Sequence, residues 1–268
     1  MTKEEKLYLE AKKAYYSGNS IMTDDEFDSL ENILKNKKSE VINIVGSNET
    51  SSKTKVAHIS PMLSLAKIKA SKNTLPPTDE FKKWLNKTSN GNLEFIIEPK
   101  FDGNACNVIY RNGKFDKAVT RGDGKEGYDI SHVIKHLVPE TININEVTEI
   151  RGEVLIKKDI FNEKYSEFKN ARNYIAGLLH RDDVTFESIQ DTDFMPFEVK
   201  VFQDNSYFYV NHEFFFDNNF KNIPYCAIID FNINPFEEIF DIFLHYRDVV
   251  SEYLLDGFVC KYYNNEDR

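Results

Sequence analysis

Residues 94–103 read Glu-Phe-Ile-Ile-Glu-Pro-Lys-Phe-Asp-Gly. A short apolar run of β type that ends at Ile97 leads to Lys100, and Gly103 closes the stretch. A lysine on a rigid strand end is well mounted as a nucleophile when a nearby glycine lets a ligand approach the backbone closely. Burial and neighbouring cations favour the neutral amine, which attacks electrophiles such as phosphates. The alternative is a solvated lysine at a strand end followed by a turn, since so short a pattern recurs by chance.

Composition limits the classes of protein to which the chain can belong. Its 268 residues are 41% hydrophobic and 29% charged, which is ordinary for a globular protein with one large domain or two smaller ones. No apolar run is long enough to span a membrane, and the N-terminal segment lacks the apolar core of a signal peptide. Three widely spaced cysteines support neither a zinc site nor a disulfide framework, so we expect a cytoplasmic protein with reduced thiols. The net charge of −10 argues against strong nucleic-acid binding by this chain alone.

The N-terminal region is expected to form a helical hairpin. Periodicity predicts helices over 3–17 and 24–38, and Thr23 and Glu26 have the spacing of a capping box for the second helix. The apolar stripe of that helix comprises Phe27, Leu30, Ile33 and Leu34. Taken as structure alone, such a hairpin is a common packing module. Residues 39–60 are polar, have weak periodicity and are interpreted as a linker.

The region after Gly103 is expected to form antiparallel strands. Asn112-Gly113 between two extended runs is a strong signal for a hairpin. The returning strand leads to residues 121–127, Arg-Gly-Asp-Gly-Lys-Glu-Gly, which either wrap a phosphate or form a flexible turn. Asp129 is expected to cap a helix whose core stripe comprises Ile130, Val133, Ile134 and Leu137.

A strand with charges on one face is expected over residues 147–156. Alternation along the strand brings Glu149, Arg151 and Glu153 to the same face. Because charges are costly in a core, we expect this face to meet solvent or a ligand. Further expected elements are a helix around 81–85, a helix over 170–180, and strands over 194–202 and 255–262, which carry Phe197, Asp256 and Lys261.

Taken in chain order, these motifs resemble those of the covalent nucleotidyltransferases, the superfamily of DNA ligases, RNA ligases and capping enzymes. The matching motifs are Lys100-x-Asp102-Gly103, Arg151-Gly152-Glu153, the strand with Phe197, and Asp256-Gly257-x-Val259-x-Lys261. Within the superfamily the chain most resembles the NAD-dependent DNA ligases, on residues 61–65, 98–103, 120–124, 149–154 and 170–177. A single Lys-x-Asp-Gly is a weak signal, whereas the ordered set is specific.

The resemblance implies a fold and a domain organisation. The fold class is α+β, with a two-sheet antiparallel nucleotidyltransferase (ATP-grasp-like) adenylation domain preceded by a small helical module. The module is expected over residues 1–57, and the adenylation domain over 58–268 with its C-terminal part incomplete. The hairpin resembles the family's module for the nicotinamide mononucleotide half of NAD, which ATP-using ligases lack. The family usually has Tyr-His where this chain has Tyr15-Tyr16, and Tyr where it has Phe27.

The resemblance also implies a reaction. Lys100 attacks the α-phosphate of NAD, releases nicotinamide mononucleotide and becomes covalently linked to AMP. Family ligases then pass AMP to the 5′-phosphate of nicked double-stranded DNA and seal the nick. The alternatives are an RNA-directed or ATP-using nucleotidyltransferase, and a non-catalytic NAD-binding protein that resembles a ligase.

Site residues follow from the resemblance, one position at a time. The implied catalytic residues are Lys100, Asp102, Arg121, Glu153 and Lys261. The implied nucleotide contacts are Ser64 and Leu65 against the adenine, Glu98 at its amino group, Phe197 stacked on the ring, and Arg121, Glu153 and Lys261. Tyr15, Tyr16, Asp24 and Asp28 are expected to hold the nicotinamide half, Glu153 and Asp256 to bind Mg²⁺, and Arg172 to bind the nick phosphate.

The family pattern continues beyond the last strand of this chain. Family members have a further lysine there and then an oligonucleotide-binding domain. We therefore expect a second chain, or a missing C-terminal region, to supply that domain and the grip on DNA. A truncated adenylation fragment and a degenerate ligase-like binder are the alternatives.

Overall fold

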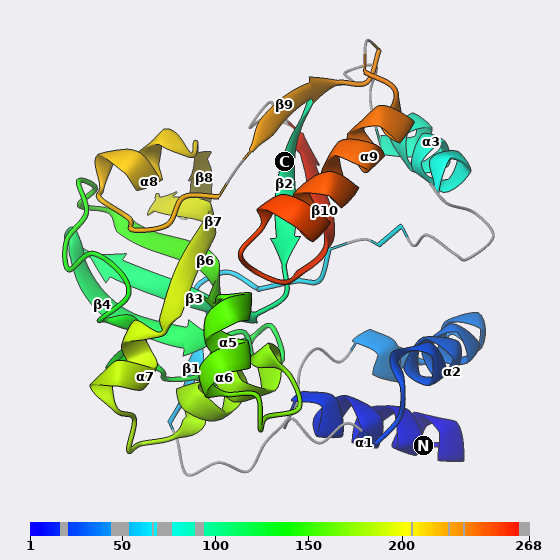
Figure 1. Ribbon diagram of the computed structural model, residues 1–268, viewed down its shortest axis with the longest axis horizontal. Coiled ribbons are helices and arrows are strands. Elements are labelled where there is room, and N and C mark those ends of the chain that lie inside the picture. Colours follow the sequence, from blue (N-terminus) through cyan, green and yellow to red (C-terminus); the bar gives the residue numbers. More distant parts are fainter. Residues whose placement is uncertain are drawn as a thin grey trace. The chain divides into compact units, whose positions relative to one another are not determined.

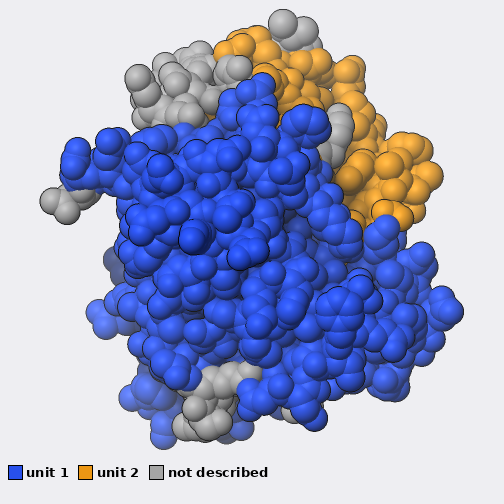
Figure 2. All heavy atoms as spheres, turned by 90° about the vertical axis from the view of Figure 1, so that its left-hand side faces the viewer, with its two compact units in different colours: residues 1–64, 103–223 blue, residues 65–102, 224–268 orange. Residues whose placement is uncertain are grey.

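The computed structural model describes residues 1–16, 21–43, 54–65, 67–68, 77–88, 94–204, 206–224, 226–232 and 234–262. The chain divides into two compact units, which Figure 2 draws in blue and orange. Unit 1 comprises residues 1–64 and 103–223, and unit 2 comprises residues 65–102 and 224–268. Both units combine helices with antiparallel strands, so the predicted α+β class is confirmed. The predicted division into 1–57 and 58–268 stays a prediction.

The predicted N-terminal hairpin is present. Helices α1 (Lys3–Tyr16) and α2 (Asp24–Asn36) are followed by the 3₁₀ turn η1 (Glu40–Asn43). The capping box of α2 forms as predicted, because Thr23 and Glu26 each accept a hydrogen bond from the other's amide. The small core comprises Tyr8, Leu30, Leu34 and Val41, with Phe27 packed against it. Ile33 was expected in the same stripe, but its side chain is 45% exposed.

A five-stranded antiparallel sheet forms the centre of unit 1, with the strand order β4-β3-β6-β7-β8 (Figure 1). Its strands are β3 (Asn104–Arg111), β4 (Lys114–Thr120), β6 (Val147–Ile156), β7 (Thr192–Gln203) and β8 (Ser206–Val210). Asn112 and Gly113 join β3 to β4 with φ values of 51° and 70°, which are typical of a two-residue hairpin with a primed turn. The predicted hairpin is thus confirmed.

One face of this sheet is apolar and packs against helices. The alternating residues Val108, Ile150, Val154, Phe194 and Val199 are buried in this core. The helices of unit 1 are α4 (Ser131–Ile134), α5 (Lys158–Lys164), α6 (Ala171–His180), α7 (Phe186–Gln190) and α8 (Glu213–Asp217). The opposite face carries the charged side chains of β6 and β7.

Two expectations about the connecting segments need correction. Residues 39–60 are not simply a linker, because β1 (Lys55–Ala57) pairs with β5 (Glu126–Tyr128) in a two-stranded antiparallel ribbon. Periodicity cannot reveal so short a strand whose partner lies far away in the sequence. Asp129 is also not the N-cap of α4. That position is Ile130, and Asp129 accepts a hydrogen bond from the amide of Ser131 at 2.9 Å.

Unit 2 contains a three-stranded antiparallel sheet with the order β10-β2-β9. Its strands are β2 (Glu94–Phe101), β9 (Ala227–Asp230) and β10 (Leu255–Tyr262), and its helical elements are α3 (Thr78–Thr88), α9 (Phe236–His245) and η2 (Tyr246–Val250). Phe95 and Ile97 of β2 pack into an aromatic core with Phe81 of α3 and Phe236 of α9. Alternation therefore turns Glu98 and Lys100 toward the other face of the sheet. None of the helices within the described residues combines the length and apolarity needed to cross a membrane.

Candidate active site

Lys100 lies on β2 opposite Gly257 of β10. A β-bulge between Leu255 and Gly257 leaves Asp256 as the extra residue of β10. A bulge of this kind redirects a side chain, and here the carboxylate of Asp256 accepts a hydrogen bond from Nζ of Lys100 at 2.7 Å. The two side chains are 37% and 42% exposed, so this ion pair is accessible to water and to a ligand.

A second ion pair lies on the same face of the three-stranded sheet. Glu98 faces Val259 across the strands, and Nζ of Lys261, two residues further along β10, donates to Glu98 at 2.6 Å. The side chain of Glu98 is only 2% exposed, whereas that of Lys261 is 17% exposed. The face therefore presents alternating charges (Glu98, Lys100, Asp256 and Lys261), although these residues are widely separated in the sequence.

Asp102 and Leu65 are the remaining predicted site residues of unit 2. The amide of Asp102, directly after β2, donates to the carbonyl of Leu254 at 2.9 Å. This bond holds the end of β2 against the segment that leads into β10. The side chain of Leu65 is 57% exposed.

In unit 1, Arg121 is contacted at both its backbone and its side chain. Its guanidinium donates to the hydroxyl of Ser64 at 2.6 Å, and its carbonyl lies 3.1 Å from Nε2 of His58. Because a carbonyl only accepts, Nε2 of His58 carries the proton. Burial lowers the pKa of His58, so the neutral ring is favoured. Nε of Arg121 is buried and has no hydrogen-bond partner among the described residues.

The glycine-rich loop after Arg121 is a compact turn. Gly122 and Gly124 have φ values of 55° and 88°, and a Cβ at Gly122 would lie 1.9 Å from the carbonyl oxygen of Glu126. The amides of Lys125 and Glu126 both donate to Asp123 at 2.9 Å. Burial alone would raise the pKa of Asp123, but these amides lower it. Since these amides are already used within the loop, the geometry favours a hydrogen-bonded turn over a phosphate cradle.

The charged face of β6 differs from the prediction, because Glu149 and Arg151 are buried rather than solvated. Glu149 is fully buried, and its carboxylate accepts hydrogen bonds from the amides of Ile59 and Ser60, the hydroxyl of Ser60 and the amide group of Asn107. Arg151, 7% exposed, donates to the carbonyl and hydroxyl oxygens of Ser60 at 2.8 and 2.6 Å. The pattern of β6 alone could not show that Ile59 and Ser60, from a distant part of the chain, cover these two charges.

Glu153, the third charged residue of this face, lies on β6 beside two glycines that the packing requires. A Cβ at Gly103 would lie 2.4 Å from the carbonyl oxygen of Val154 and 3.3 Å from Oε2 of Glu153. A Cβ at Gly152 would lie 2.4 Å from the ring of Phe194 on β7. Any larger residue at either position would force the backbone near Glu153 to move.

Phe197 and Arg172 occupy distinctive positions in unit 1. β6 and β7 change register between Arg151 and Gly152, which face Glu198 and Pro196, so Phe197 is the extra residue of a bulge. Arg172 lies in the first turn of α6, and Asn170, the N-cap residue of this helix, accepts a hydrogen bond from the amide of Asn173. The predicted contacts for the nicotinamide half (Tyr15, Tyr16, Asp24 and Asp28) have side chains outside the described residues.

Sequence reasoning did not single out His58 and Ser60, although both are central to the geometry of unit 1. The available signal was a histidine and a serine two residues apart, directly before the Pro-Met-Leu-Ser-Leu segment at 61–65. Lys200 of β7 was also not singled out. It is 5% exposed and lies 3.5 Å from Glu198, with its ammonium 4.6 Å from the ring centre of Tyr207.

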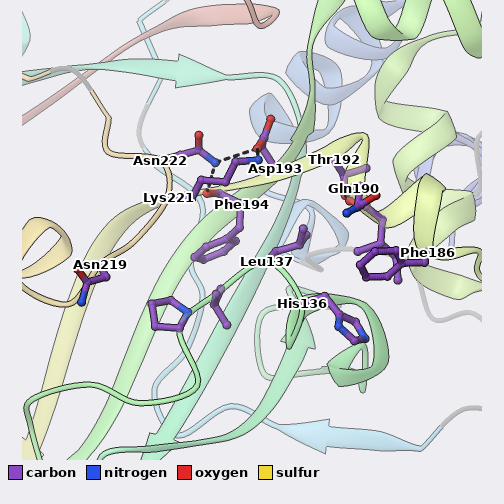
Figure 3. A pocket seen from close by; sticks show the side chains of 13 residues that line it. His136, Leu137, Phe186, Gln190, Thr192, Asp193, Phe194, Asn219, Lys221 and Asn222 are labelled. Atoms are coloured by element: carbon purple, nitrogen blue, oxygen red, sulfur yellow. Dashed lines mark hydrogen bonds and ion pairs between the residues drawn. The ribbon is translucent and has the colours of Figure 1, made fainter.

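A pocket of about 420 Å³ lies elsewhere in unit 1 and contains none of the predicted site residues (Figure 3). Its wall includes Asp193, which accepts from Lys221 at 2.8 Å and from Asn222 at 3.1 Å. His136 and Phe186 line another part, with their rings edge to face. Since Asp193 is already bonded to Lys221 and Asn222, these residues do not indicate a particular ligand or reaction for the pocket.

Comparison with known proteins identifies the family. Residues 50–266 match the sequence profile of the NAD-dependent DNA ligase adenylation domain. The chain belongs to this family. Residues 1–41 also match the profile of the PGRL1 N-terminal domain.

Relatives of this adenylation domain are DNA ligases of several organisms. A DNA ligase of Sulfurimonas denitrificans is 33% identical over 92% of this chain and 40% of the relative. A DNA ligase of Mesomycoplasma hyopneumoniae is 33% identical over 81% of this chain and 34% of the relative. The chain thus spans about two fifths or less of the length of these two relatives. A solved RNA ligase of Naegleria gruberi with ATP and Mn has a TM-score of 0.41 and 12% identity over 83% of this chain and 58% of that one.

Proposed function

We propose that this adenylation domain reacts with NAD to form a covalent lysyl-AMP on Lys100. Nζ of Lys100 first gives up one ammonium proton, and the carboxylate of Asp256, 2.7 Å away, is within reach to accept it. The lone pair of the neutral amine then attacks the α-phosphorus, a P–N bond forms, and the bond to the phosphate of nicotinamide mononucleotide breaks. The leaving group takes the bonding electrons, and the nitrogen loses its second proton to water.

The charged face of the three-stranded sheet is the observation that carries this proposal. Lys100 faces a carboxylate on an accessible surface, and the second cation, Lys261, lies on the same face. A phosphoryl-transfer transition state gathers negative charge on its oxygens and is stabilised by positioned cations. We assign this stabilising role to Lys261 and Arg121, and the amino group of the adenine to Glu98.

Further contacts with the substrate are proposed from the family resemblance. Ser64 and Leu65 lie against the adenine and Phe197 stacks on it, while Tyr15, Tyr16, Asp24 and Asp28 hold the nicotinamide half. Asp102 and Glu153 complete the catalytic set. The hydroxyl of Ser64 already bonds to Arg121, which supports a shared role for these two residues.

Mg²⁺ is a proposed cofactor, and Glu153 and Asp256 are its proposed ligands. No group of three metal-ligating side chains occurs among the described residues. The proposal rests on the two carboxylates, since Mg²⁺ commonly binds one or two carboxylates together with substrate phosphates and water. When bound, the ion would neutralise charge on the phosphates.

Transfer of AMP to nicked double-stranded DNA is proposed as the purpose of the adduct. The relatives are DNA ligases, and this chain spans only part of their length. From the family resemblance we assign the nick phosphate to Arg172. We also propose that an oligonucleotide-binding domain, in a second chain or a C-terminal region, supplies most of the grip on DNA. The net charge of −10 agrees with that division of work.

Intact-protein mass spectrometry tests the proposal. We expect one added adenylate after incubation with Mg²⁺ and NAD, no adduct with ATP, and complete loss of the adduct in Lys100→Ala. Lys117→Ala is the matched control, because the Lys117 side chain is 35% exposed and also lies beside an aspartate. An adduct formed with ATP alone would point to the ATP-using branch. Retention of the adduct in Lys100→Ala would overturn the assignment.

A further inference from the structure

A segment of unit 1 that ends at Ser64, the first predicted adenine contact, is anchored to the charged face of β6. We call residues 58–64 the strap. The amides of Ile59 and Ser60 donate to Oε1 of Glu149 at 3.1 and 3.3 Å, and the hydroxyl of Ser60 donates to Oε2 at 2.8 Å. Arg151 donates to the carbonyl of Ser60 from the same face. Both carboxylate oxygens of Glu149 are thus committed to the strap.

The two ends of the strap contact Arg121. At one end, Nε2 of His58 lies 3.1 Å from the carbonyl oxygen of Arg121. At the other end, the hydroxyl of Ser64 accepts from the Arg121 guanidinium at 2.6 Å. Between them, the amide of Met62 donates to the carbonyl of Gly124 at 2.8 Å. A displacement of the strap would therefore move both the backbone and the side chain of Arg121.

We propose that Glu149 and Arg151 are positioning residues, which hold Arg121 and Ser64 in place for the nucleotide through the strap. The inference rests on the proposed function. A buried ion pair contributes little net stability compared with well-packed apolar side chains, so stability alone does not explain two charges at these sites. Their hydrogen bonds instead fix one path for the strap, since a different path would leave buried charges without partners.

A double-mutant cycle in the complete chain tests this connection. The readouts are the rate of adduct formation and the NAD concentration that gives half the maximal rate, for Glu149→Gln, Ser64→Ala and the double variant. We expect each single variant to need roughly tenfold more NAD. The double variant should need little more than the worse single variant, because both changes release the same guanidinium. Multiplicative effects would mean that Glu149 acts independently of Ser64, and would overturn the inference.

Two further variants separate positioning from folding. Ser60→Ala removes the hydroxyl that joins Glu149 to Arg151 but keeps both charges, and we expect a smaller rise in the NAD requirement. Asp191→Asn is the matched control, since the Asp191 side chain is 12% exposed and bonds to Tyr165 and Lys164 in the same unit. It should lower thermal stability and leave the NAD requirement unchanged.

Hydrogen exchange gives a readout that does not depend on activity. In free Glu149→Gln, amide exchange should rise in residues 58–64 and in the loop 121–127, while α6 stays protected. Unchanged exchange in that loop would overturn the inference. If the wild-type chain forms an adduct but folded Glu149→Gln keeps the wild-type NAD requirement, only the positioning inference fails. If the wild-type chain forms no adduct, the proposed function fails as well.

Discussion

In unit 2, Lys100 and Lys261 each face a carboxylate across two neighbouring strands, whereas in unit 1 the strap, Asn107 and Arg151 all converge on Glu149. The Lys100–Asp256 pair is more than a third exposed, and a pair of this kind contributes about 0–1 kcal/mol. Lys100 and Asp256 can therefore release each other and bind substrate groups instead, at little cost in free energy. The network around Glu149 is buried, so its bonds cannot be exchanged in this way.

This difference suggests two kinds of contribution to the proposed reaction. In the proposed reaction, Lys100 and Asp256 of unit 2 change partners, whereas the strap of unit 1 fixes the guanidinium of Arg121 beforehand. Groups that are already oriented need no reorganisation as charge develops. The Glu98–Lys261 pair has an intermediate character, because Glu98 is 2% exposed while Lys261 is 17% exposed.

The largest effect on stability is expected from Arg151→Met. The substitution removes the guanidinium 3.2 Å from Glu149 and leaves the buried carboxylate without an opposite charge to offset its loss of hydration. We expect the free energy of unfolding to fall by about 3–5 kcal/mol, as measured by urea denaturation. Adding Glu149→Gln to Arg151→Met should recover much of this loss, because no charge then remains buried at the strap. A loss below about 1 kcal/mol would place this network in the same class as the exposed pairs, and the comparison would break down.

Local sequence signals predicted those parts of the fold that depend on neighbouring residues. The capping box at Thr23, the turn at Asn112 and Gly113, and the helix that follows Asn170 each depend on residues within a few positions, and each is present. The motifs around Lys100 and Lys261 also predicted the strands that carry them.

What the sequence did not reveal depends on distant pairing. The bulges that single out Asp256 and Phe197 arise from register between strands, and register is not written in either strand alone. Similarly, the alternation in β6 showed that Glu149 and Arg151 share a face. It did not show that Ser60, far earlier in the chain, covers that face.

A smaller effect on stability, with a large effect on chemistry, is expected from Asp256→Asn. The exposed Lys100–Asp256 pair contributes little to folding, so the free energy of unfolding should change by less than about 1 kcal/mol. The rate of adduct formation should fall by roughly a hundredfold, because the residue proposed both as proton acceptor and as Mg²⁺ ligand is lost. Urea denaturation and single-turnover adduct formation measure the two quantities. A large loss of stability would show that this pair is structural, like the network of unit 1.

The smallest effect is expected from the titration of His58. Burial lowers the pKa of His58 in the folded chain, while the unfolded chain titrates near about 6.5. The unfolded state therefore binds more protons between these two pKa values, and stability falls as the pH drops below about 6.5. Among the nearby charges, that of Glu149 favours the charged form of the ring, whereas that of Arg151 opposes it.

We expect the free energy of unfolding to decrease more between about pH 7.5 and about pH 5.5 in the wild-type chain than in His58→Gln. Glutamine keeps a donor for the carbonyl of Arg121 but does not titrate. Adduct formation in the wild-type chain should decline over the same interval, because a protonated ring that leaves its buried position also releases the carbonyl end of Arg121. If adduct formation depends on pH in the same way in the wild-type chain and in His58→Gln, the end of the strap at His58 does not control Arg121. The strap would then be anchored by its other contacts, at Ile59, Ser60, Met62 and Ser64.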